Sequence, residues 1–184
     1  MTRIIAGGLG GRRIETPKGD GTRPTSDRVR ESLFASLRSL LGGFGELTVL
    51  DLYAGSGALG LEALSRGASS AVLVESDANA AAVITRNVRE LGVPARVQRS
   101  SVERYLESSS DGPFDLVLCD PPYAVTGTVL TEQLTSLRRL LGLGSVVVVE
   151  RSSRTPDLVW PDGYEPLRHK AYGETTLWYG QAHG

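Results

Sequence analysis

Four consecutive residues, Asp120-Pro121-Pro122-Tyr123, carry the most chemical information in the chain. They follow an apolar run, Phe114 to Cys119, that predicts a buried strand ending in a short loop. The prolines lack N–H donors and restrict the backbone, so the carbonyls of Asp120 and Pro121 are held stiffly beside an acceptor carboxylate. The ring that follows can stack on a planar group. The pattern suits a site for a planar amine, although Asp-Pro-Pro is also common at strand ends, and alone it leaves both interpretations open.

A second motif lies upstream, where the apolar run Thr48 to Leu52 leads into a glycine-rich turn, Ala54 to Gly60. A strand, a glycine turn and a helix start form a pocket of nucleotide size, because glycines let the backbone approach a ligand that helix N–H groups then face. The glycine spacing also fits the dinucleotide fingerprint and does not identify the cofactor by itself.

Two acidic residues narrow the choice of cofactor. Glu75 ends the next apolar run, from Ala71, at a place where a carboxylate can accept both hydroxyls of a ribose. Asp51 precedes the glycines, where a carboxylate suits a positively charged amino group and is poorly placed beside a pyrophosphate. We therefore infer S-adenosylmethionine as the cofactor, with a nicotinamide oxidoreductase as the less favoured alternative.

The elements that position these motifs alternate along the chain. Strands are predicted near 47–52, 71–75, 95–99, 114–119 and 145–150, and helices near 58–66, 77–91, 101–107 and 128–140. This alternation predicts an α/β fold, a mostly parallel Rossmann-like sheet with helices on both faces. Two further runs, Glu165 to Lys170 and Thr175 to Tyr179, predict a closing hairpin that supplies an antiparallel C-terminal strand.

The N-terminal part has a different character. Met1 to about Ile14 predicts a small β extension turned by glycine pairs, and residues 15–25 form a Pro/Gly linker. A helix is expected to begin near Ser26 or Asp27, either of which is an acceptable N-cap. Its core face is expected to carry the apolar residues at helical spacing, Val29, Leu33, Leu37, Leu40 and Leu41.

Charge is distributed unevenly although the net charge is only −1. Residues 1–38 hold eight Arg and Lys against four Asp and Glu, so that the rest of the chain is acidic. Such asymmetry is typical of phosphate contact, and a merely solvated charged face is the alternative. The residues expected to contact nucleic-acid phosphates are Arg3, Arg12, Arg13, Arg23, Arg28 and Arg30.

Composition limits the remaining possibilities. A chain of 184 residues with 40% hydrophobic content suits one domain, and no apolar run approaches the ~20 residues of a membrane span. The charged, glycine-rich start does not predict a signal peptide. Cys119 is the one cysteine, which excludes an internal disulfide, indicates a packed core thiol and fits a cytoplasmic location. We expect a monomer, because no apolar surface helix is evident.

The motifs together resemble known enzymes. The segment Asp51 to Ala68, with Asp120 to Tyr123, looks like a class I methyltransferase that modifies an exocyclic amino group. Stretches near both ends resemble the RsmD family, bacterial 16S ribosomal RNA guanine-N2 methyltransferases, and the resemblance runs from Arg3 to about Tyr179. These stretches are Arg3 to Gly7, Gly11 to Arg13, Arg23 to Phe34 and Lys170 to Thr175.

The resemblance implies an RNA-facing extension and linker over 1–25 and a methyltransferase domain over 26–184. It places Asp51 and Gly55 near the methionine part of the cofactor, Glu75 at the ribose and Ser101-Val102 near adenine, where many relatives carry an acid instead. The full set of expected cofactor contacts is Asp51, Tyr53, Gly55, Ser56, Gly57, Glu75, Ser76, Asp77, Ser101 and Val102. For Tyr53, packing is favoured over direct contact.

The expected catalytic residues are Asp120, Pro121, Pro122 and Tyr123. Asp120 and the Pro121 carbonyl would hold a guanine N2 amine, Asp120 would stabilise charge on the nitrogen and take its proton, and Tyr123 would stack on the base. No metal is expected, since the methyl donor is already activated, and His169 is expected to be structural or solvent-exposed. The expected substrate is 16S rRNA or an assembling small ribosomal subunit. Alternatives are DNA adenine N6, protein glutamine, or a non-catalytic role in ribosome assembly.

Overall fold

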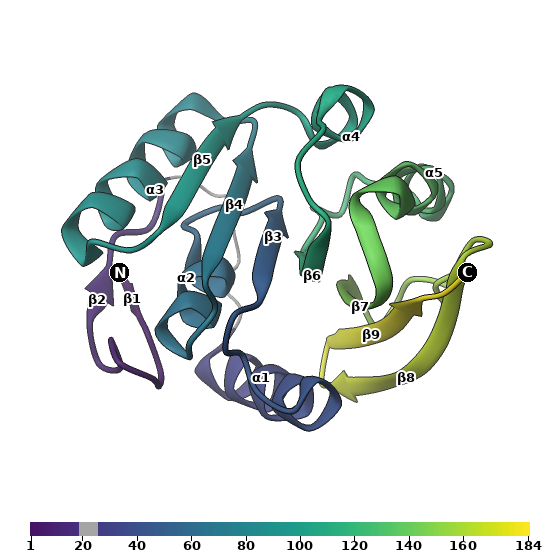
Figure 1. Cartoon of the computed structure of the whole chain (residues 1–184), viewed down its shortest axis with the longest axis horizontal. Helices are drawn as coiled ribbons and strands as arrows, with labels where there is room; N and C mark the ends of the chain where they lie inside the picture. The colour runs from purple at the N-terminus through teal and green to yellow at the C-terminus, as the bar shows by residue number, and fades with distance from the viewer. Residues whose placement is uncertain (19–25) are drawn as a thin grey trace.

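The computed structural model describes residues 1–18 and 26–184, which form a two-stranded sheet and a seven-stranded sheet (Figure 1). The strands are β1 (Thr2–Arg3), β2 (Arg13–Ile14), β3 (Thr48–Leu52), β4 (Ser70–Glu75), β5 (Ala95–Arg99), β6 (Phe114–Cys119), β7 (Leu141–Ser152), β8 (Tyr164–Tyr172) and β9 (Thr175–Ala182). The helices are α1 (Asp27–Leu41), α2 (Ala58–Ser65), α3 (Ala78–Leu91), α4 (Val102–Ser108) and α5 (Gly127–Leu137), followed by a 3₁₀ turn (Arg138–Leu140).

The large sheet has the strand order β5-β4-β3-β6-β7-β9-β8. The first five strands are parallel, β9 is antiparallel to β7, and β8 pairs with β9 as a hairpin. The expected α/β fold with a mostly parallel sheet and an antiparallel C-terminal strand is confirmed. All five parallel strands end at one edge, called the carboxyl edge below, where open α/β sheets bind their ligands.

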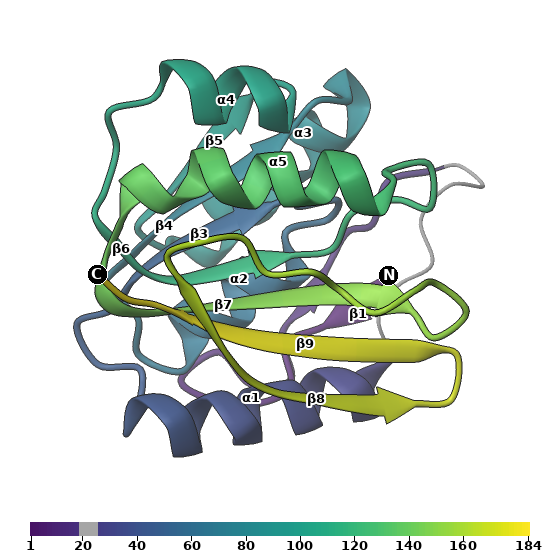
Figure 2. The ribbon, with the colours of Figure 1, turned by 90° about the vertical axis from the view of Figure 1, so that its right-hand side faces the viewer.

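Helices cover both faces of the sheet and create two cores (Figures 1 and 2). Residues from α1, α2 and α3 pack on one face, called the α1 face, and residues from α4 and α5 pack on the other. The central strands are apolar on both faces, as a covered parallel sheet requires. In β7, for example, Val146 and Val148 enter the first core while Val147 and Val149 enter the second.

Several element boundaries differ from the sequence-based expectations. Strand β7 begins at Leu141 rather than 145, because Leu141 pairs with Phe114 before an irregularity in register. The helix expected over 128–140 ends at Leu137 and tightens into the 3₁₀ turn. Both strands of the C-terminal hairpin are longer than expected, since their pairing continues over the whole of β8.

The N-terminal extension is packed against the main sheet's helices. Strands β1 and β2 pair antiparallel, as expected, and Ile4 and Ile14 are fully buried in the core on the α1 face. The buried carboxylate of Glu62 in α2 accepts the backbone N–H groups of Ile5 and Ala6 at 2.8 and 3.1 Å. These contacts satisfy a charge that would be costly to bury alone.

Helix α1 begins as the sequence predicted. The Ser26 hydroxyl accepts the N–H of Val29, which confirms the N-cap, and Gly42 ends the helix in the left-handed conformation. The segment after α1 leads to the start of β3, so the first turn of α1 lies toward the carboxyl edge and its last turn lies toward the opposite edge (Figure 2). No helix within residues 1–18 and 26–184 is long and apolar enough to cross a membrane.

Candidate active site

The glycine turn joins β3 to α2 at the carboxyl edge. Gly55 and Gly57 have φ angles of 61° and 83°, which side chains other than glycine rarely adopt. A Cβ on Gly60 would lie 2.2 Å from Leu73 Cδ2 and 3.1 Å from Asp51 Oδ2, so only glycine allows α2 to pack this closely on the sheet. A Cβ on Gly55 would meet nothing within 4 Å, so the outer side of the turn is open to a ligand.

Asp51 lies beneath this turn and is almost completely buried. Its Oδ2 accepts the backbone N–H of Gly60 at 2.9 Å. The pKa of Asp51 is raised from 3.8 to about 8. Burial is the main cause and the charge of Glu75 adds to it, while the hydrogen bond from Gly60 acts in the opposite direction. A positive charge above the turn would favour the ionised form, which is the property expected of a carboxylate serving a cationic cofactor.

Glu75 ends β4 beside the same turn. Its Oε1 accepts the N–H of Gly55 at 2.8 Å, and its Oε2 accepts the N–H of Asp77 at 2.9 Å. Asp77 caps α3 through the N–H of Ala80, and Ser76 between them is exposed. The structure thus brings Asp51, Gly55 and Glu75 together as the sequence predicted, although their cofactor contacts stay predictions.

The region expected to receive adenine follows β5. The Ser101 hydroxyl caps α4 by accepting the N–H of Arg104 at 3.2 Å, and Val102 is buried. Tyr53 is half-buried, and its hydroxyl lies within hydrogen-bonding distance of the Gln133 side chain. Gln133 also donates to Glu103 at 2.6 Å. These hydrogen bonds connect Tyr53, directly after β3, with Glu103 in α4 and Gln133 in α5. They were not predicted, since none of the three contacts is part of a sequence motif.

The Asp120-Pro121-Pro122-Tyr123 loop leaves β6 at the carboxyl edge, beside the end of β3. Pro121 is buried, Pro122 is exposed, and the Tyr123 side chain is 78% exposed, so its ring is free to stack. Arg151 of β7 donates to the carbonyl of Val125 at 2.9 Å and so fixes the far side of the loop.

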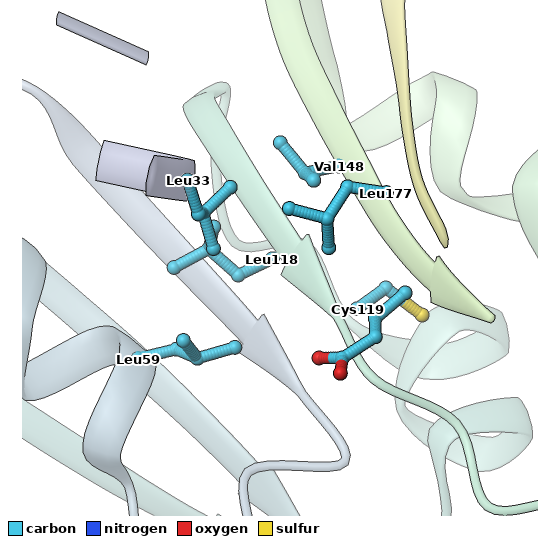
Figure 3. A pocket seen from close by; sticks show the side chains of 7 residues that line it. Leu33, Leu59, Leu118, Cys119, Val148 and Leu177 are labelled. Carbon is cyan, nitrogen blue, oxygen red and sulfur yellow. The ribbon is translucent and has the colours of Figure 1, made fainter. Parts of the chain in front are cut away.

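Glu150, near the end of β7, is a partner of Asp120 that the sequence analysis missed. Burial raises the pKa of Asp120 well above its ordinary value, and the charges of Glu150 and Asp51 and a hydrogen bond with Glu150 raise it further. The sequence did contain a signal for Glu150, because this acid follows the apolar run Val146 to Val149 just as Glu75 follows the run from Ala71. Glu150 is also one of the residues that line a small hollow of about 10 Å³. The other lining residues, labelled in Figure 3, are Leu33, Leu59, Leu118, Cys119, Val148 and Leu177.

The arginines expected to contact RNA are in different environments. Arg3, Arg12, Arg13 and Arg28 are exposed, and Arg23 lies outside the described residues. The prediction for Arg30 is wrong: its side chain is 1% exposed and donates to Asp27, Thr2 and the carbonyl of Arg3. Arg30 lies on the buried face of α1, so its guanidinium is not accessible to a phosphate.

The exposed arginines also lie at different edges of the sheet. Arg28 is in the first turn of α1, near the carboxyl edge, and Arg3 pairs with the neighbouring Asp27 at 3.2 Å. Arg12 donates to the carbonyl of Glu90, in the last turn of α3, which is toward the opposite edge. Arg28 is therefore better placed for RNA at the Asp120 loop than Arg12.

His169 and Cys119 occupy the structural roles expected of them. The His169 ring is exposed and stacks on Trp178, with ring centroids 4.5 Å apart. Beside it, a hollow of about 310 Å³ on the C-terminal hairpin is lined mainly by apolar and aromatic side chains, Leu158, Trp160, Pro166, Leu167, Arg168, His169 and Trp178. Cys119 is buried, and burial raises the pKa of its thiol, which makes it a poor nucleophile.

Replacing Asp51 with Asn should change how stability depends on pH. The pKa of Asp51 is about 8 in the folded state and near its ordinary value when unfolded, so the wild type loses stability as pH rises between these values. The Asn side chain cannot ionise, so Asp51→Asn does not lose stability in this way. The unfolding free energy of the variant, relative to that of the wild type, should therefore rise by up to about 1.4 kcal/mol per pH unit. Urea unfolding across this window measures it, with exposed Asp162→Asn as control. A difference that is constant with pH would contradict the assignment.

Comparisons with known proteins agree with this geometry. A family model described as Conserved hypothetical protein 95 matches residues 2–181. The chain is similar to the Ribosomal RNA small subunit methyltransferase D of Escherichia coli K12, with 42% identity over 122 residues. This alignment covers 66% of the chain and spans 60% of the length of that relative. The protein of the same name from Haemophilus influenzae is 33% identical over 178 residues, which cover 93% of this chain and 89% of that relative.

A solved structure gives the same result over almost the full length. The putative methyltransferase yhhF from Escherichia coli has a TM-score of 0.84 and 34% identity, and the match covers 98% of this chain and 97% of that chain. The resemblance noted from the motifs is confirmed, and the chain belongs to the family described as Conserved hypothetical protein 95, which is the RsmD family.

Proposed function

We propose that the protein transfers a methyl group from S-adenosylmethionine to the exocyclic N2 amine of a guanine in 16S rRNA. The observation that carries the proposal is the position of the Asp120-Pro121-Pro122-Tyr123 loop, which leaves β6 beside the β3 glycine turn at the carboxyl edge. Relatives named for methylation of small-subunit ribosomal RNA support the choice of substrate.

The residues around the glycine turn fit S-adenosylmethionine. The turn is open above Gly55, and the carboxylates of Asp51 and Glu75 lie beneath and beside it. A cofactor with a sulfonium and an amino group offsets this negative charge, whereas a pyrophosphate would be repelled by it. When bound, S-adenosylmethionine supplies an electrophilic methyl group, so the chain's residues need only align the acceptor amine and manage its proton.

The Asp120 loop fits a planar amine. Asp120 and the Pro121 carbonyl supply hydrogen-bond acceptors, and the exposed Tyr123 ring supplies a stacking surface. Two acceptors pin the amine nitrogen and favour pyramidalisation, which frees a lone pair that is otherwise delocalised into the base. Asp120 then stabilises the charge that develops on nitrogen and accepts its proton.

The substrate is proposed to be an assembling small ribosomal subunit rather than free RNA. The net charge is −1, so electrostatic affinity for RNA alone is modest. A structured ribonucleoprotein supplies further contacts. We propose that the protein acts as a monomer in the cytoplasm.

The activity test is transfer of labelled methyl from S-adenosylmethionine to small subunits that lack native methylation, with free 16S rRNA in parallel. Mass spectrometry of the digested nucleosides should find the label in N2-methylguanosine. Label in N6-methyladenosine would instead favour the activity of another relative, a tRNA1(Val) (adenine(37)-N6)-methyltransferase that is 32% identical over 91 residues. Cofactor binding without transfer to any acceptor would favour a non-catalytic assembly role.

Replacing Asp120 with Ala should lower kcat by about a hundredfold or more, because the amine loses both its orienting acceptor and its base. The dissociation constant for S-adenosylmethionine should stay close to that of the wild type. Single-turnover methylation and calorimetric cofactor binding measure the two effects. Asp162→Ala, in an exposed turn before β8, is the matched control. Wild-type kcat in the Asp120 variant would refute the role.

Replacing Tyr123 with Ala should weaken productive RNA binding while cofactor binding stays unchanged. Base stacking on an aromatic ring is worth about 1–3 kcal/mol, so KM for the RNA substrate should rise roughly five- to 150-fold. Tyr123→Phe keeps the ring and should stay near wild type. Equal losses in the two variants would mean that the hydroxyl matters and that stacking does not.

Replacing Arg28 with Ala should lower affinity for the RNA substrate and reduce the slope of log affinity against log salt by about one, as expected for one lost phosphate contact. Arg38→Ala is the matched control, since Arg38 is exposed on the same helix but in its last turn. The double change Arg12→Ala with Arg13→Ala tests the extension separately. An unchanged slope in a variant would show that its arginines do not contact RNA.

A further inference from the structure

We infer that Arg28, Arg154 and Lys170 form one RNA-contacting surface at the carboxyl edge, called the edge cluster below, that binds phosphates beside the target guanine. The three side chains are exposed and come from α1, the loop after β7 and β8. The inference rests on the proposed function and deepens it. The charge asymmetry of the sequence pointed only to residues 1–38, so Arg154 and Lys170 are new candidates.

The strand register puts Lys170 in line with the Asp120 loop. Strands β6 and β7 are parallel and in register at their ends, so Asp120 and Glu150 follow as neighbours. Glu150 lies opposite Leu177 of β9, and Leu177 lies opposite Lys170 of β8. Adjacent strands are about 4.8 Å apart, so the backbone at Lys170 is about 14 Å from the start of the loop. A phosphate of a nucleotide near the target guanine can reach this position.

Helix α1 brings Arg28 to the same end of β8. Figure 2 shows α1 alongside β8, and Arg168 of β8 donates to the carbonyl of Ser36 in α1 at 3.3 Å. Strand β8 runs toward the carboxyl edge, whereas α1 runs away from it. From this contact, Arg28 is about 12 Å back along the helix, and Tyr172 is about 13 Å forward along the strand. Arg28 is therefore level with the last residues of β8, which include Lys170.

The loop after β7 is fixed to the turn of the C-terminal hairpin, and this holds Arg154 at the same edge. The backbone N–H of Ser153 donates to the carbonyl of Glu174 at 2.8 Å, and the Ser153 hydroxyl donates to the carbonyl of Gly173 at 3.1 Å. The Arg154 side chain is 86% exposed and lies 3.8 Å from a carboxylate oxygen of Glu174. Such exposed ion pairs contribute little free energy, so Arg154 can exchange this contact for a phosphate.

The chemistry of the edge cluster suits single-stranded RNA. The Lys170 ammonium lies 5.2 Å from the centroid of the Tyr172 ring, and the exposed Tyr123 ring follows Asp120 at the same edge. Cations beside aromatic rings bind single strands, because phosphates contact the cations and bases stack on the rings. The exposed acids Glu31 and Glu174 lie on the same segments, so the surface is only moderately cationic. It therefore suits a few local phosphate contacts rather than strong attraction to any anionic partner.

The test measures binding to free 16S rRNA over a range of salt concentrations for Arg154→Ala, Lys170→Met and the double variant. Each single change should weaken binding and reduce the slope of log affinity against log salt by about 0.7 to 0.9, and the double change by about twice as much. Lys170→Arg keeps the charge and should stay near wild type. Arg89→Ala, exposed in the last turn of α3 toward the opposite edge, is the matched control.

Three results would overturn the inference. The first is a wild-type slope in both Arg154→Ala and Lys170→Met. The second is an equal loss in Lys170→Arg and Lys170→Met, because the effect would then not follow charge. The third is weaker binding to complete small subunits with an unchanged slope on free RNA, which would mean that the edge cluster contacts a ribosomal protein. Equal urea unfolding midpoints and equal dissociation constants for S-adenosylmethionine show that the variants keep their fold.

Binding is measured without methyl transfer, so failure of the inference differs from failure of the proposed function. If the wild type methylates no guanine but the slopes fall in the two single variants, the proposed function fails and the RNA surface stands. If the wild type forms N2-methylguanosine and the variants keep the wild-type slope and KM for RNA, only the edge cluster fails.

Discussion

The site depends on burying negative charge at the ends of neighbouring strands. Asp51, Asp120 and Glu150 come from β3, β6 and β7, which are adjacent in the sheet. Burying an isolated carboxylate costs several kcal/mol, so each must be protonated or receive donors. Asp51 receives the N–H of Gly60, and Asp120 shares a hydrogen bond with Glu150. A ligand that brings positive charge completes the balance, and this is the physical reason that a sulfonium cofactor suits the site.

The glycine turn allows that arrangement to form. Gly60 lets the first turn of α2 approach Leu73 and Asp51 so closely that its N–H becomes the donor that Asp51 needs. The N-terminal end of a helix also carries partial positive charge, which favours a carboxylate there. Glu75 makes a second connection, because its carboxylate accepts the N–H of Gly55 in the glycine turn and the N–H of Asp77 in the loop after β4. The cofactor pocket is therefore shaped by carboxylates that hold backbone, before any ligand contact is considered.

Sequence patterns predicted most of this, and their failures have specific causes. Apolar periodicity located β3, β4 and β6 almost to the residue, because buried parallel strands have few alternatives. The first residues of β7 were missed, since Gly142 to Gly144 carries no strand signal. Arg30 was assigned to RNA because of its charge. Its spacing of three and seven residues from Leu33 and Leu37 already placed it on the buried face of α1. The acid at the end of the apolar run was a signal for Glu150, but its contact with Asp120 depends on β6 and β7 being neighbours, which only the strand order decides.

The same topology separates the tasks of the two ends of the site. Carboxylates at the ends of β3 and β4 hold the glycine turn, whereas the acceptors that we propose for the amine come from the end of β6. Because β3 lies between β4 and β6, the proposed reaction would take place over the end of β3, where Tyr53 lies half-buried. The β extension is anchored to α2 by Glu62 and reaches the end of α3 through Arg12. The extension also covers part of the core on the α1 face, where Ile4 and Ile14 are buried.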